Sequence, residues 1–147
     1  MGELTMGKLA RRAGVNAETL RYYERRGLLP RPPRTASNYR LYPEASARRV
    51  RFIKRAQEMG FSLREIGELL SLRARPGAKC ADVLGRAREK VRDIDAKMEA
   101  LRAMRKALSR LTRECSGKGP VTECPILEAL DPEEIQETPP RGARRSS

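Results

Sequence analysis

The stretch from Ala81 to Glu114 constrains the fold of this chain more than any other part of its sequence. It contains no proline and one glycine, Gly85. Its apolar residues form two series with a seven-residue repeat, and the series alternate in the 3-4 spacing of a coiled-coil seam. The two series are Leu84, Val91 and Met98, and Ala87, Ile94, Leu101 and Leu108. Because one helix cannot bury such a stripe by itself, we predict a dimerisation helix over residues 80–114.

The composition limits the rest of the chain to a small core. Of its 147 residues, 39% are hydrophobic and 35% are charged, with two Phe and no Trp, which favours elongated helices over a large globular core. The absence of histidine excludes a histidine base, a His-containing zinc finger and a Ser-His-Asp triad. The sequence also lacks a paired-carboxylate motif and a phosphate-binding loop, so we do not expect an enzyme.

The same sequence indicates the cellular compartment. No apolar run approaches the roughly 20 residues that a membrane span needs, and the first residues lack the apolar core of a secretory signal. We therefore expect a cytoplasmic protein without a membrane partner. Three cysteines, an odd number in a reducing compartment, favour free thiols over a disulfide scaffold.

Positive charge is concentrated in the first part of the chain. The whole sequence has 32 Lys and Arg against 19 Asp and Glu, a formal net charge of +13, and residues 1–60 hold 14 of these basic residues and 5 of the acidic ones. Arginine predominates and lies close to short helices and tyrosines. This combination favours contact with phosphates and bases over a merely solvated face or a membrane surface. We predict that this part binds double-stranded DNA.

Two short helices joined by a tight turn are predicted at the start of the basic part. Thr5 can cap the first helix, which extends to Ala13, and Asn16 can cap the second, which ends at Arg26 before Gly27. A helix-turn-helix of this kind usually places its second helix in the major groove. The side chains of the second helix that point away from its core-facing residues are the candidate DNA contacts, Thr19, Arg21 and Tyr22.

A wing is predicted after this helix pair. Residues 29–34 are too rich in proline for a helix, and residues 38–42 alternate as in a short β-ribbon. Such a wing can lie along the DNA backbone, and a packed loop with solvated arginines is the alternative. By position, the wing residues that could lie along the phosphates are Arg34, Tyr39, Arg40 and Tyr42, and the DNA contacts that we predict from the wing are Arg34, Tyr39 and Arg40.

A second helix pair completes the predicted DNA-binding domain over residues 1–75. Apolar spacing predicts a helix over residues 43–59, and the S-x-x-E sequence from Ser62 to Glu65 is a capping box that opens the next helix. The fold class is therefore mainly α, a winged helix-turn-helix domain followed by a long antiparallel coiled-coil dimerisation helix. The remaining predicted parts are the dimerisation helix over 80–114, a metal-binding loop and short helix over 115–130, and a disordered tail over 131–147.

The three cysteines lie at the two ends of the predicted dimerisation helix. Cys80 precedes it, Cys115 follows it, and Cys124 begins the next short helix. A continuous helix between the first two would be about 52 Å long, so these thiols of one chain cannot share a site. In an antiparallel dimer, Cys80 of one protomer lies near Cys115 and Cys124 of the partner subunit, and two equivalent three-thiolate sites result.

Three thiolates without imidazole suit soft metal ions. Helix N-termini and nearby Lys79 and Lys118 favour the thiolate forms of these cysteines. Zinc usually takes four ligands, and calcium and magnesium take oxygen, which leaves Hg(II), Pb(II), Cd(II), Cu(I) or trivalent arsenic. Three-coordinate geometry favours Hg(II) or Pb(II). A thiol–disulfide switch between Cys115 and Cys124, and a DNA-bending protein with bystander cysteines, remain as alternatives.

Two regions of the sequence resemble the MerR family of bacterial transcription regulators. The first is MGKLARRAGVNAETLRYYERRGLLPRP with SNYRLY, and the second is RVRFIKRAQEMGFSLREIGELL. The resemblance extends over residues 4–130. It implies a winged helix-turn-helix, an antiparallel dimer helix and an effector region, which agrees with the prediction from the residues.

Within this family, the chain is most similar to the mercury(II)-responsive members. Cys80, Cys115 and Cys124 resemble their three ligands, and the separations of 35 and 9 residues match. The resemblance implies Hg(II) as the effector, with Pb(II) or Cd(II) as alternatives because lead-responsive members share the spacing. It also implies that the dimer, acting as repressor and activator, untwists promoter DNA for RNA polymerase when the metal binds.

Overall fold

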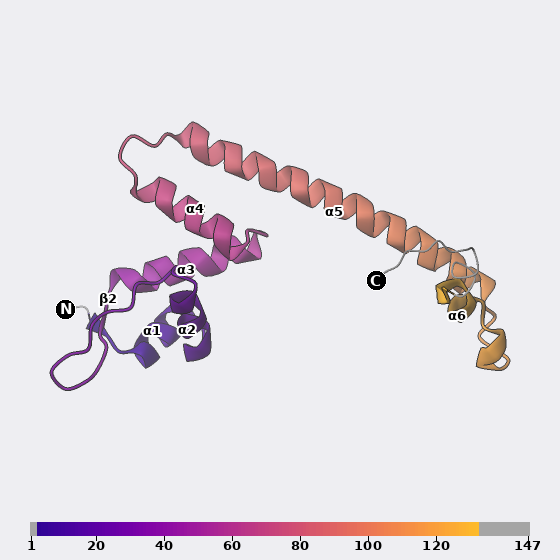
Figure 1. The fold of residues 1–147 in the computed structure, drawn as a ribbon, viewed down its shortest axis with the longest axis horizontal. Coiled ribbons are helices and arrows are strands. Elements are labelled where there is room, and N and C mark those ends of the chain that lie inside the picture. The colour runs from indigo at the N-terminus through magenta and orange to yellow at the C-terminus, as the bar shows by residue number, and fades with distance from the viewer. Residues whose placement is uncertain (1–2, 133–147) are drawn as a thin grey trace, which may run out of the picture. The chain divides into compact units, whose positions relative to one another are not determined.

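The computed structural model describes residues 3–132, and Figure 1 shows their path. The chain divides into two compact units, and the boundary along the chain falls between Ile94 and Asp95. These described residues are mainly helical, as the sequence predicts. The predicted disordered tail lies outside the described residues from position 133 onward.

The first helix pair is the predicted helix-turn-helix. It consists of α1 (Met6–Ala13) and α2 (Ala17–Arg25). The side chains of Thr5 and Asn16 each accept a hydrogen bond from the backbone N–H three residues later, at 3.2 and 2.8 Å. Both predicted N-caps are therefore confirmed. Gly14 ends α1 with a φ of 75°, a left-handed conformation that glycine adopts without steric cost.

The second helix pair packs on the first. It consists of α3 (Ala45–Glu58) and α4 (Leu63–Ala74), and α4 opens with the predicted capping box of Ser62 and Glu65. Together the four helices enclose one small core. Its most buried side chains are Leu9, Leu20, Tyr23, Leu29, Tyr42, Val50, Ile53 and Ile66.

Basic side chains of α3 hold the end of α1 in place. Arg51 donates a hydrogen bond to the carbonyl of Arg12 at 3.2 Å, and Lys54 donates to the carbonyl of Gly14 at 3.0 Å. The last carbonyls of a helix have no partner inside the helix. These cations therefore satisfy the C-terminus of α1 and join the two helix pairs.

A two-stranded sheet that the sequence did not indicate closes the wing. β1 (Glu3–Leu4) pairs antiparallel with β2 (Tyr42–Pro43), with Leu4 opposite Tyr42. Within the wing, Arg34 and Arg40 form an isolated antiparallel bridge. Tyr42 does not lie along the phosphates, as its position in the wing had allowed, because its strand pairing places the ring in the core with 0% exposure.

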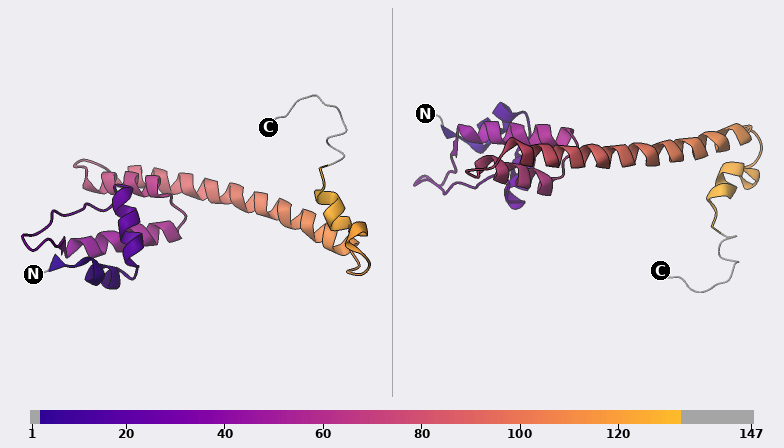
Figure 2. Two further views of the ribbon diagram at one scale, coloured as in Figure 1. Left: turned by 60° about the horizontal axis from the view of Figure 1, so that its bottom comes forward. Right: turned by 90° about the horizontal axis from the view of Figure 1, so that it is seen from above.

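The long helix α5 (Cys80–Glu114) has 35 residues and follows the predicted dimerisation helix closely. Figure 2 shows it in two further views. The predicted apolar stripe is exposed in the single chain, as expected for a surface that needs a second helix. Exposed members of the stripe are Leu84, Val91, Ile94, Met98, Leu101 and Leu108.

Two short helices follow α5. They are η1 (Val121–Glu123), a 3-10 turn that the sequence did not indicate, and the predicted α6 (Pro125–Leu130). Within residues 3–132, no helix combines the length and the apolar character needed to cross a membrane.

Candidate nucleic-acid interface and thiol site

A basic hollow of about 470 Å³ lies between α2 and the wing. Most of the charged residues that line it are arginines, so the hollow can accept an anion such as a DNA phosphate. It brings together four of the six predicted DNA contacts from two separate elements. These four residues are Arg21, Arg34, Tyr39 and Arg40. Two further arginines of the lining, which no sequence pattern indicated, are Arg25 and Arg31.

The wing arginines of the hollow also stabilise the wing itself. Arg34 donates to the carbonyl of Asn38 at 3.1 Å, and Arg40 donates to the carbonyl of Pro32 at 2.7 Å. A guanidinium has five N–H donors, so each arginine retains donors for another ligand. The wing is therefore shaped by the same groups that can bind phosphate.

The two other predicted contacts on α2 do not line this hollow. Tyr22 is 39% exposed, and the guanidinium groups of Arg25 and Arg26 lie 5.8 and 5.7 Å from its ring centroid. Arg26 also donates a hydrogen bond to the Tyr22 hydroxyl at 2.9 Å. Thr19 is half-buried, and its backbone N–H makes the N-cap bond to Asn16.

A buried carboxylate joins α2 to the wing. The Glu24 side chain is only 4% exposed, accepts a hydrogen bond from the Tyr42 hydroxyl, and lies 3.5 Å from Arg31 Nε. Burial and the neighbouring Glu24 raise the pKa of Tyr42 above its usual value, so the hydroxyl keeps its proton and donates. No sequence pattern indicated Glu24 and Arg31, because their importance depends on contact between distant residues.

The structure brings two of the three cysteines together. Cys115 follows α5, and Cys124 immediately precedes α6; their side chains share a hydrogen-bonding contact. Backbone N–H groups of Leu127 and Ile126 also bond the Cys124 sulfur, and these bonds, with that of Cys115, lower the pKa of the Cys124 thiol. A thiol with a lowered pKa is a better ligand for a soft cation.

Cys80 is the exposed first residue of α5. All three cysteines are free thiols. Across residues 3–132 of a single chain, no three Cys, Asp or Glu side chains are grouped closely enough to hold a metal ion. Cys115 and Cys124 can thus supply two ligands of a soft-metal site, and one further donor would complete a three-coordinate site.

Known proteins match most of this chain. Residues 4–72 match the family described as "MerR HTH family regulatory protein", and residues 47–111 match the one described as "MerR, DNA binding". A mercuric resistance operon regulatory protein of Bacillus cereus is 45% identical over 125 residues, which cover 85% of this chain and 95% of that relative.

Two solved structures are also similar to the chain. The transcription regulator PbrR691 from Ralstonia metallidurans CH34, in complex with lead(II), is 37% identical with a TM-score of 0.76, and the match covers 87% of this chain and 99% of that one. The dual-function transcriptional regulator MerR from Bacillus megaterium MB1, in complex with mercury(II), is 39% identical with a TM-score of 0.66, over 86% and 98% of the two chains.

Proposed function

The chain belongs to the MerR family of DNA-binding transcription regulators, which are not enzymes, and from this we propose that it is a dimeric regulator with Hg(II) as its effector. The dimer binds promoter DNA and represses transcription without the metal. Binding of Hg(II) then distorts the DNA so that RNA polymerase can start transcription. Each base pair rotates the duplex by roughly 35°, so modest untwisting realigns two promoter elements.

The basic hollow between α2 and the wing supports the DNA-binding part of this proposal. We assign Thr19, Arg21 and Tyr22 of α2, and Arg34, Tyr39 and Arg40 of the wing, to DNA contact. The arginines of the hollow are suited to phosphate contacts. Thr19 and Tyr22 lie on α2 outside the hollow, and we assign them to DNA contacts made by that helix. Phosphate contacts of this kind predict binding that weakens steeply as the salt concentration rises.

The pairing of Cys115 and Cys124 is the observation that carries the metal-binding part. Two thiols in contact, one of them with a lowered pKa, are a partial site for a soft cation. We propose that Cys80 of the partner subunit supplies the third thiolate. A metal bridging two protomers bonds well only when both are correctly placed, so it favours one conformation of the dimer.

Pb(II) is the second candidate effector, and Cd(II) is a weaker one. The similar structure of PbrR691 in complex with lead(II) favours Pb(II) as the alternative. Contact between Cys115 and Cys124 is also compatible with a thiol–disulfide switch on DNA. In vitro transcription with each metal ion in turn, and with oxidant alone, separates these candidates.

A mixed-dimer experiment tests the site directly. One variant carries Cys80→Ser, and the other carries both Cys115→Ser and Cys124→Ser, so neither homodimer has three thiols at any shared site. A heterodimer of the two variants has one complete site if the site spans two protomers. We expect this heterodimer to retain Hg(II) against excess competing thiol, with the ultraviolet absorption of three-coordinate Hg(II), whereas both homodimers lose it.

The opposite result is equally informative. If all three donors came from one chain, mixing the variants would restore nothing, and the proposed inter-protomer site would be wrong. A wild-type dimer that binds Hg(II) but shows no metal-dependent transcription would instead reject Hg(II) as the effector.

A further inference from the structure

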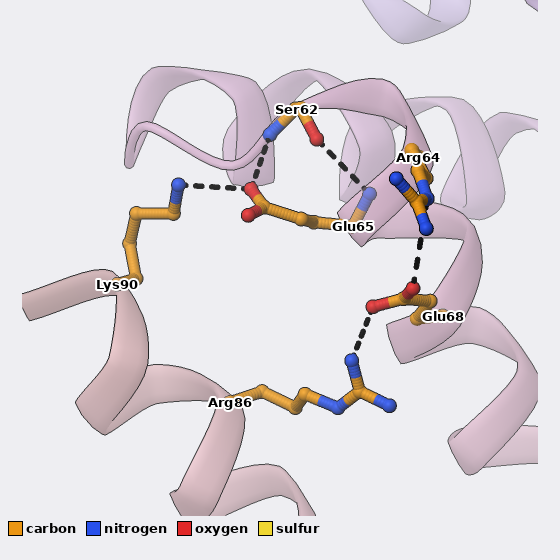
Figure 3. Close-up of polar contacts among 6 residues, drawn as sticks. All are labelled: Ser62, Arg64, Glu65, Glu68, Arg86 and Lys90. Atoms are coloured by element: carbon orange, nitrogen blue, oxygen red, sulfur yellow. Dashed lines mark hydrogen bonds and ion pairs between the residues drawn. The ribbon is translucent and has the colours of Figure 1, made fainter. Parts of the chain in front are cut away.

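Two ion pairs join α4 to the first turns of α5, as Figure 3 shows. Lys90 Nζ lies 2.8 Å from Glu65 Oε1, and Arg86, one turn before Lys90 on α5, pairs with Glu68, about one turn after Glu65 on α4. All four residues belong to the first compact unit. We call Glu65, Glu68, Arg86 and Lys90 the α4–α5 clamp.

The clamp is built into the start of α4. Glu65 Oε1 accepts the hydrogen bond of the Ser62 backbone N–H at 2.8 Å as well as that of Lys90 (Figure 3). The Ser62 hydroxyl in turn accepts from the Glu65 backbone N–H at 3.1 Å. A movement of Lys90 therefore acts directly on the capping box that begins α4.

Lys90 is unusually placed for a lysine. Along α5, all of which the structure describes, it is the only buried residue, with 9% exposure. Its ammonium lies 5.7 Å from the centre of the Phe61 ring and 3.4 Å from Asp93. Lysine is almost never buried unless it is paired, and here the carboxylate of Glu65 supplies the partner that offsets the cost of burial.

Apolar packing on the neighbouring surface of α5 is incomplete in the single chain. A hollow of about 490 Å³ separates the start of α5 from α3 and α4, and apolar side chains form most of its walls. Its apolar lining residues are Phe52, Ala56, Phe61, Leu69, Val83 and Ala87. The two ion pairs of the clamp therefore provide specific polar contacts between α5 and α4 beside this incompletely packed surface.

The clamp also lies close to the proposed metal ligand on α5. Arg86 and Lys90 follow Cys80 by two and three helical turns, which places them about 9 and 15 Å along the helix axis from it. A displacement of Cys80 within a rigid helix therefore reaches α4 at the clamp. From α4 it can pass to α3, whose Arg51 and Lys54 hold the end of α1.

We propose that the α4–α5 clamp is the positioning element that transmits metal binding at Cys80 to the DNA-binding helices. The inference rests on the proposed function, since it needs a metal-dependent change on DNA. Neither Glu65, Glu68, Arg86 nor Lys90 touches DNA or metal in this scheme. Loss of the clamp should therefore leave DNA binding and Hg(II) binding intact while Hg(II) no longer changes the conformation of the bound DNA.

The first test compares Lys90→Met with the control Arg92→Met, which removes a positive charge from an exposed position on the same part of α5. The DNA probe is a supercoiled plasmid that carries a site selected from random sequence by the wild-type dimer. We expect Lys90→Met to keep DNA affinity and Hg(II) affinity within about threefold of wild type. Its Hg(II)-induced untwisting, measured as a change in linking number, should fall by about tenfold.

A charge exchange at the second ion pair provides an independent test. Glu68→Arg should weaken the Hg(II)-induced untwisting through like-charge repulsion with Arg86, and adding Arg86→Glu should restore it. A Glu68→Arg protein that melts at the wild-type temperature and still loses the untwisting separates transmission from a loss of fold stability.

Four results distinguish the possible failures. Normal untwisting by folded Lys90→Met, or failure of Arg86→Glu to rescue Glu68→Arg, overturns the clamp proposal. An equal loss in Arg92→Met also overturns it, because the effect would then reflect charge alone. If wild-type protein does not untwist the plasmid with Hg(II), the proposed function fails first.

Discussion

Glu24 is the residue at which the two parts of the candidate DNA surface are joined. It lies on α2, accepts a hydrogen bond from Tyr42 of β2, and lies near Arg31 at the base of the wing. A buried carboxylate is unfavourable unless hydrogen bonds and opposite charge compensate for its lost hydration. The contacts of Glu24 therefore favour one orientation of the wing relative to α2.

This arrangement predicts that Tyr42→Phe destabilises the protein without changing its charge. The substitution removes the hydroxyl that donates to buried Glu24, and we expect a loss of about 1–3 kcal/mol in the free energy of unfolding. Tyr39→Phe is the matched control, because Tyr39 is 63% exposed and should change stability by at most about 0.5 kcal/mol. Urea unfolding measures the stability of both variants. Equal unfolding midpoints for Tyr42→Phe and Tyr39→Phe would contradict a stabilising hydrogen bond between Tyr42 and Glu24.

At the scale of elements, the start of α4 shows how one side chain serves a helix and its neighbour. Glu65 completes the capping box of α4 and also pairs with Lys90 of α5. The ammonium of Lys90, followed by the backbone N–H of Ser62, lowers the pKa of Glu65, and Glu65 raises the pKa of Lys90. Both groups are therefore charged at neutral pH, and the contact depends on pH.

The lowered pKa of Glu65 gives a prediction with a definite sign. A carboxylate whose pKa is lower in the folded protein stabilises it above the ordinary value of 4.5, and this contribution disappears as the pH falls through the lower folded value. We expect wild type to melt at a higher temperature than Glu65→Gln at pH 7, and the gap to close below pH 4.5.

Glutamine keeps an acceptor for Ser62, so this comparison isolates the charge of Glu65. In the Lys90→Met background, the same Glu65→Gln substitution should have a smaller effect at pH 7, because the main cause of the shift is absent. A gap that is constant between pH 7 and pH 3 would show that the carboxylate charge does not contribute.

At the scale of the whole molecule, a single chain leaves both its apolar stripe and its candidate metal site incomplete. Large apolar side chains of α5 are exposed, and no three potential metal donors meet within the described residues 3–132. A second copy supplies the missing surface and, in the proposed function, the missing thiolate. The regulator is thus expected to act only as a dimer.

The dimer interface can be tested with Leu101→Glu. Leu101 is 61% exposed in the single chain, and its burial in a dimer contributes about 1.5–3 kcal/mol for each of the two copies. We expect the dissociation constant of the dimer to rise by at least about 100-fold, measured by sedimentation equilibrium. Ala103→Glu, which adds the same charge outside the predicted stripe, is the control, and equal effects would place the interface elsewhere.

Local patterns in the sequence determined much of this structure. The N-caps Thr5 and Asn16, the capping box at Ser62 and the heptads of α5 each depend on residues a few positions apart. Hydrogen bonds and side-chain spacing within one helix follow directly from its repeat, so the order of the helices could be predicted. The basic charge of the candidate DNA surface was also visible without a structure.

Only the tertiary structure decided which distant residues meet. The pairing of β1 with β2 buried Tyr42, although its sequence position indicated an exposed wing residue. Glu24 and Lys90 look like ordinary surface charges until folding surrounds each with partners from another element. Burial and electrostatic pairing depend on the three-dimensional positions of whole elements, and no short sequence pattern carries that information.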